Sequence, residues 1–154
     1  QPVDITYERY CDTAAGIQCI TDSTQISSTR RSSFTLPNGN SGTALLLFLS
    51  SNEEEYIEVE QGLSAGKNAD ECIAYLSGIW EDVSGASLSE IMTESREDDI
   101  IWKFRIVSHD SDISIFAAAD IDGVPYIVGA STSEENIDNS GNVLAEIIGT
   151  LRPL

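Results

Sequence analysis

Apolar and polar residues alternate along several short segments of this chain, a pattern typical of half-buried β-strands. The segment 56–60, for example, alternates Tyr and Glu with Ile and Val. The same alternation predicts strands over residues 33–36, 43–50, 56–60, 88–94, 100–107, 113–119 and 124–130. Turn sequences at 37–40 (Pro-Asn-Gly-Asn) and 120–123 (Asp-Ile-Asp-Gly) predict hairpins that join neighbouring strands.

Two longer segments carry apolar residues at the 3.6-residue spacing of an amphipathic helix. The first spans about 69–84, after the helix-capping residue Asn68; Glu71 completes a capping box and Gly85 ends the helix. The second spans about 140–151. Short hairpins and two helices together predict an α+β fold, in which the helices cover an antiparallel β-sheet.

The start of the chain is expected to form a β-hairpin arm and a connection (1–31), followed by a single domain at 32–154. The arm would place Cys11 opposite Cys19, where we expect a disulfide bond, with free thiols or metal binding as alternatives. Cys72 lies on the apolar face of the first helix and is expected to be a buried, unreactive thiol. A disulfide bond would indicate a periplasmic or extracellular protein. The first residue, Gln, agrees with removal of a signal peptide, although a trimmed chain would begin in the same way.

Composition narrows the classes of partner. The chain has 154 residues, of which 41% are hydrophobic, enough for the core of one domain. Its 26 Asp and Glu residues outnumber 8 Lys and Arg residues, for a formal net charge of −18. This charge repels phosphate backbones and anionic lipids, so we expect no nucleic-acid partner. The longest apolar run, 44–49, is far shorter than the roughly 20 residues of a spanning helix, so we expect no membrane insertion.

No complete catalytic or metal-binding motif is present in the sequence. The single histidine, His109, lies in a polar turn, where a solvent-facing role is favoured over a Ser–His–acid or Cys–His site. Asp120 and Asp122 match part of a calcium loop, and with Asp110 and Asp112 they would form a looser site if the two turns shared one end of the sheet. The predicted strand directions place them at opposite ends. We therefore expect no metal, no cofactor and no catalytic residue.

One segment carries a resemblance to known proteins. The run Phe34-Thr35-Leu36-Pro37-Asn38-Gly39, followed by a strand, resembles the Phe-x-x-Pro-x-Gly motif of the Mog1/PsbP/DcrB-like superfamily. The order of elements after it is similar too, so the resemblance covers about 32–154. Members of this superfamily are mostly non-enzymatic accessory, chaperone or assembly proteins. The resemblance therefore implies binding and transfers no catalytic residue to this chain.

These observations predict a non-enzymatic, secreted or periplasmic domain that binds a basic protein, as an immunity-type inhibitor or an accessory subunit. A highly acidic surface accelerates encounter with a cationic partner. On charge density alone, we expect partner contacts at Glu53, Glu54, Glu55, Glu58, Glu60, Asp110 and Asp112. The alternatives are a small hydrolase with an unrecognised site and a calcium- or small-ligand-binding module.

Overall fold

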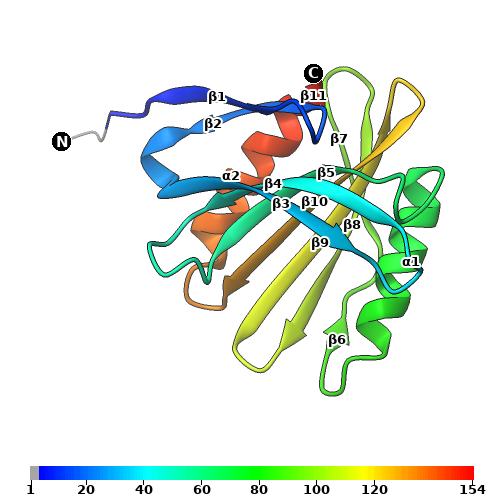
Figure 1. Ribbon diagram of the computed structural model, residues 1–154. Helices are drawn as coiled ribbons and strands as arrows, with labels where there is room; N and C mark the ends of the chain where they lie inside the picture. Colours follow the sequence, from blue (N-terminus) through cyan, green and yellow to red (C-terminus); the bar gives the residue numbers. More distant parts are fainter. Residues whose placement is uncertain (1–3) are drawn as a thin grey trace.

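The computed structural model describes residues 4–154 (Figure 1). It contains two α-helices, α1 (Ala69–Glu81) and α2 (Ile137–Thr150), and one short 3₁₀ helix, η1 (Ser23–Gln25). The strands in chain order are β1 (Tyr7–Asp12), β2 (Ile17–Asp22), β3 (Ser28–Thr35), β4 (Ser41–Phe48), β5 (Tyr56–Gln61), β6 (Ser87–Leu88), β7 (Met92–Ser95), β8 (Ile101–His109), β9 (Asp112–Ile121), β10 (Val124–Ser133) and β11 (Arg152–Pro153). The α+β class predicted from the sequence is confirmed.

The strands form two antiparallel sheets. The larger has eight strands, in the order β3-β4-β5-β10-β9-β8-β6, with β7 pairing β8 as well. The pairing of β5 with β10 joins the two halves of the chain in one sheet. The predicted hairpin turn between β9 and β10 is confirmed, since Asp122 and Gly123 have φ of 52° and 79°, the left-handed values of a tight hairpin turn. The smaller sheet, β1-β2-β11, contains the hairpin expected at the start of the chain and adds β11, which was not predicted.

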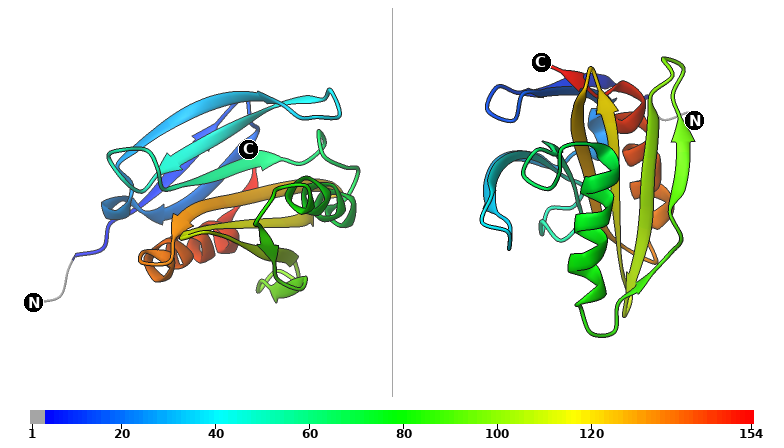
Figure 2. Two further views of the ribbon diagram at one scale, coloured as in Figure 1. Left: turned by 90° about the horizontal axis from the view of Figure 1, so that it is seen from below. Right: turned by 90° about the vertical axis from the view of Figure 1, so that its right-hand side faces the viewer.

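The two helices pack on opposite faces of the large sheet (Figure 2). Side chains alternate between the faces along each strand. On β9, Ala117 belongs to the core cluster that includes Val143 and Ile147 of α2, whereas Phe116 belongs to the cluster that includes Ile73 of α1. The sheet is larger than expected for a sheet covered by helices, and α1 packs mainly on β8, β9, β10 and the short β6. Strands β3, β4 and β5 are left without a helix on the α1 face.

The N-terminal arm departs from prediction by one residue of register. Asp12 pairs with Ile17, so Tyr10, and not Cys11, stands opposite Cys19. A one-residue slip turns a side chain to the other face of a hairpin. Cys11 is therefore exposed, Cys19 is buried in the α2-face core, and the expected disulfide bond between them is absent. Asp12 sets this register, because its side chain accepts a hydrogen bond from the Ala15 N–H at 2.8 Å.

Element boundaries also differ slightly from the predicted ones. Helix α1 begins after Asn68 as expected, with the Asn68 side chain accepting from the Glu71 N–H at 2.9 Å. It ends at Glu81, before Gly85, and α2 begins at Ile137, three residues earlier than expected. The large sheet starts at Ser28, so the connection after the arm is shorter than the predicted one. Within residues 4–154, neither helix has the length and apolar character needed to cross a membrane.

Candidate functional site

Three turns bring acidic residues to one end of the large sheet, on the left and lower left of Figure 1. They are the β4–β5 turn, the β8–β9 turn and the loop from β10 to α2. The Glu134 N–H donates to the Ser111 carbonyl at 3.1 Å, and the Asn136 side chain donates to Glu55 at 3.1 Å, so the three turns contact one another. We name this surface the acidic end, and it comprises Glu53, Glu54, Glu55, Asp110, Asp112, Glu134 and Glu135.

Most acidic side chains of the acidic end form no ion pair within residues 4–154. Arg30 neutralises Glu53 through a hydrogen-bonded ion pair of 3.0 Å and lies 4.9 Å from the centre of the Phe48 ring. Glu54 and Asp110, by contrast, are exposed and form no ion pair within residues 4–154. Five of the seven acidic positions predicted as partner contacts therefore lie together here, although they come from two separate turns.

The other two predicted contacts, Glu58 and Glu60, lie elsewhere. They share a face of β5 with Tyr56, and that face is the α1 side of the sheet. Glu60 is only 7% exposed, so it does not contribute to an open charged surface. The sequence pattern assigned these side chains to solvent because it could not show that residues of α1 and of the β3–β4 hairpin line the same groove. Figure 2 shows α1 and this hairpin as separate layers of the molecule.

Glu58 and Glu60 line a groove of about 260 Å³ between α1 and strands β3, β5, β9 and β10. Aromatic side chains form much of its wall, and Gly129, which stands opposite Glu58 on β10, leaves it open. The lining residues are Phe34, Leu36, Tyr56, Glu58, Glu60, Leu76, Trp80, Ser114, Ile115, Phe116, Ile127, Gly129, Ala130 and Ser131. We name this feature the acidic groove. Among these residues of the described chain there is no Lys, Arg or His.

The electrostatics of the acidic groove are unusual for a pair of glutamates. The Oε2 atom of Glu60 is buried and has no hydrogen-bond partner within residues 4–154. Burial, the negative charge of Glu58 and a hydrogen bond with that carboxyl group raise the pKa of Glu60 to about 9. Burial also raises the pKa of Glu58, against the opposing effect of its hydrogen bond with Glu60. The pair therefore holds a proton at neutral pH, when no other positive charge is near.

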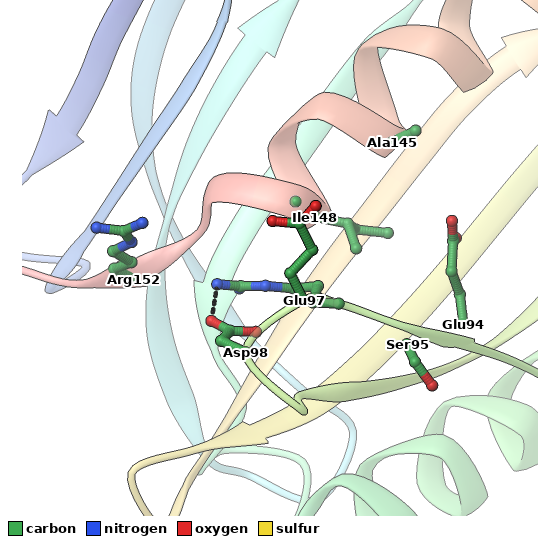
Figure 3. A pocket seen from close by; sticks show the side chains of 9 residues that line it. Glu94, Ser95, Glu97, Asp98, Ala145, Ile148 and Arg152 are labelled. Carbon is green, nitrogen blue, oxygen red and sulfur yellow. Dashed lines mark hydrogen bonds and ion pairs between the residues drawn. The ribbon is translucent and has the colours of Figure 1, made fainter.

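A second hollow, of about 380 Å³, lies between the β7–β8 turn and the last turns of α2 (Figure 3). Its central side chain, Arg96, donates to the Leu151 carbonyl at 2.8 Å and pairs with Asp98 at 2.5 Å. In Figure 3, Arg152 lies apart from Asp98 and Glu97. Arg96 is thus paired within the molecule, and its bond to the Leu151 carbonyl holds the end of α2 against the sheet.

The residues considered for catalysis or calcium binding are not assembled into a site. Asp112 begins β9 and Asp120 lies at its other end, which confirms that the two aspartate turns occupy opposite ends of the sheet. Asp120 instead accepts a hydrogen bond from the Ala69 N–H at 2.9 Å, at the start of α1. Within residues 4–154, no three His, Cys, Asp or Glu side chains are grouped so as to hold a metal ion.

The architecture defines a class: an antiparallel sheet with α1 on one face and the C-terminal helix α2 on the other, the fold of PsbP-like proteins. The solution structure of the cyanobacterial PsbP protein (CyanoP) from Synechocystis sp. PCC 6803 superimposes with a TM-score of 0.63, over 99% of this chain and 95% of that chain. The sequences are 11% identical in this comparison. The sequence matches no protein-family model and no curated protein. The resemblance inferred from Phe34 to Gly39 is thus confirmed at the level of the fold.

Proposed function

We propose that this chain is a non-enzymatic accessory protein that acts in the periplasm or outside the cell and binds a basic protein through its acidic end. The observation that carries the proposal is the convergence of three acidic turns on one end of a PsbP-like fold. Exposed charges of one sign steer a cationic partner and make association sensitive to salt. In this role the protein acts either as an inhibitor of a basic toxin or as an accessory subunit of a basic complex.

The test begins with a pull-down from the native extract at about 50 mM and about 300 mM salt, because the higher salt shortens the Debye length and weakens surface attraction. We expect a basic protein at stoichiometric amount that is lost at the higher salt. Its absence at both salt concentrations would contradict the proposal.

Two matched variants then locate the contact. The first replaces four acids of the acidic end with amides: Glu54, Asp110, Glu134 and Glu135. The second replaces four exposed acids elsewhere with amides: Asp4, Glu8, Glu94 and Asp122. Both lower the net negative charge by four, but only the first should slow association with the captured partner by about tenfold or more. Equal effects would show that the total charge, and not the acidic end, attracts the partner.

A further inference from the structure

The acidic groove contains a buried acid that forms no ion pair within residues 4–154. Glu60 is 7% exposed, lines the groove, and its Oε2 atom has no hydrogen-bond partner among residues 4–154. Buried carboxylates are normally paired or hydrogen-bonded, since an uncompensated charge in an apolar setting is strongly unfavourable. Without a cation, the Glu58–Glu60 pair avoids this cost by holding a proton. A ligand that displaced this proton would have to donate hydrogen bonds and carry positive charge.

Basic side chains of the same face are held elsewhere. Arg30 pairs with Glu53, Lys103 pairs with Asp70, and Arg105 donates to the Ser89 carbonyl at 2.8 Å. None of the three lines the groove. The positive charge must then come from another molecule.

The lining favours an organic cation over a metal ion. Calcium takes six to eight oxygen ligands, and the groove offers two carboxylates with walls of Phe34, Tyr56 and Trp80. Aromatic faces attract ammonium and guanidinium groups, most strongly at tryptophan. An alkyl stem lies well against the apolar part of such a wall.

The size and direction of the groove limit the ligand further. A volume of about 260 Å³ is just below the usual range of small-molecule pockets, about 300–1,000 Å³, so a single short chain fits and a large cofactor does not. At one end, the Asn38 N–H donates to the Tyr75 hydroxyl at 3.0 Å, which ties the β3–β4 turn to α1. Strand register places Glu60 nearer this tied end and Tyr56 nearer the acidic end.

From these contacts we infer that the acidic groove binds a small organic cation, an ammonium or guanidinium group on an aliphatic stem, with its charge held by Glu58 and Glu60. The stem lies along the aromatic wall toward the acidic end. This inference stands on the groove alone and does not require the proposed function. A free amine and a lysine side chain of a peptide offer the same chemistry.

Binding is measured with the whole chain by following backbone amide and indole NMR signals during titration at about pH 8. This pH lies below the Glu60 pKa of about 9, so an entering cation displaces the proton that the pair holds. The probes are n-pentylamine, the blocked peptide Gly-Gly-Lys-Gly-Gly, and the same peptide acetylated on its lysine. We expect saturable shifts at Glu58, Gly129 and the Trp80 indole with a Kd at or below about 1 mM for a charged probe. The acetylated peptide should give none.

Three variants separate recognition from folding. Glu60→Gln keeps the shape of the side chain and should weaken binding at least about tenfold. Gly129→Val fills the groove and should abolish binding; a Cβ at this position meets only ordinary contacts, the nearest at 3.7 Å from the Ile115 carbonyl oxygen. Glu54→Gln makes the same side-chain change in the acidic end, outside the groove, and should bind as the unchanged chain does.

The outcomes are decisive in both directions. Tighter binding of pentylamine identifies a free amine as the source, tighter binding of the peptide identifies a protein side chain, and either result supports the inference. The inference is overturned by no saturable shift with either charged probe up to about 50 mM, by equal binding to the Glu60→Gln variant, or by groove shifts with calcium alone. The acidic-end variants leave the groove intact, so a failure of the cation-binding inference would not count against the proposed function.

Discussion

Replacing Glu60 with glutamine should make the protein more stable at alkaline pH. The folded state keeps the Glu60 proton up to a pKa of about 9, whereas an unfolded glutamate releases it near its ordinary value of 4.5. Folding therefore takes up a proton throughout this window, and the free energy of unfolding falls as pH rises. The contribution of the protonated group is complete below the unfolded pKa and is lost as pH approaches the folded pKa.

The magnitude follows from the linkage relation. One proton taken up on folding changes the free energy of unfolding by about 1.4 kcal/mol per pH unit, so the unchanged chain should lose about 3 kcal/mol between about pH 6 and pH 8 from this group. Glutamine has no proton to lose, and its amide can donate to Glu58 as the protonated acid does. The stability difference between the two proteins should grow by that amount, a sizeable part of the 5–15 kcal/mol typical of a domain.

Urea unfolding, followed by fluorescence of the buried Trp102 and by circular dichroism, gives the free energy at each pH. Glu54→Gln is the matched control, because it makes the same Glu-to-Gln change at an exposed position. Repulsion within a chain of net charge −18 also varies with pH, but it affects all three proteins alike. Parallel curves for Glu60→Gln and the unchanged chain would refute the buried-proton argument.

Three further predictions concern the scaffold. Arg96→Ala should lower the free energy of unfolding by about 2–3 kcal/mol, because it removes a buried charged donor from the Leu151 carbonyl; an unchanged urea midpoint would contradict this role. In the native protein, a thiol reagent should modify exposed Cys11 quickly and Cys19 only after unfolding, since burial raises the pKa of the Cys19 thiol to about 12. If adding a reductant lowered the stability of the protein, that result would instead indicate a disulfide bond. Asn68→Ala should lower stability by about 1 kcal/mol through loss of the helix cap, and a loss no larger than that of the neighbouring Lys67→Ala would contradict the capping role.

Local signals in the sequence were sufficient for most of the secondary structure. The Asp122–Gly123 turn was predicted because Asp-Gly is one of the few residue pairs that readily adopt left-handed conformations at both central positions of a tight hairpin turn. The start of α1 was predicted from Asn68, which can satisfy free amide groups of the first helical turn. In each case the information lies within a few residues, so distant contacts do not alter it.

The register of the N-terminal hairpin and the burial of Glu60 under neighbouring elements could not be predicted in the same way. The pairing of the arm depends on which loop closes it, and the Asp12 contact with the Ala15 N–H selects a loop that separates Cys11 from Cys19. The burial of Glu60 depends on α1 and the β3–β4 hairpin, which are distant in sequence and rise on either side of it. The sequence nonetheless contained one signal for the groove. Leu76 and Trp80 of α1 are apolar but are not among the fully buried residues of this helix, which indicates a further apolar surface beside it.

The geometry of the fold explains why a groove exists, but not why it is acidic. An α-helix is about 10 Å wide. Seven strands lie side by side in the large sheet, and at a spacing of about 4.8 Å they extend about 29 Å, so part of the α1 face must remain uncovered. Apolar residues at positions 58 and 60 would suit that face and avoid the unfavourable burial of charge. The two glutamates are therefore a stability cost that binding of a cation would offset. One substitution should then have two opposite effects: Glu60→Gln should strengthen the fold near pH 8 and weaken cation binding. A purely structural acid would show the first effect without the second.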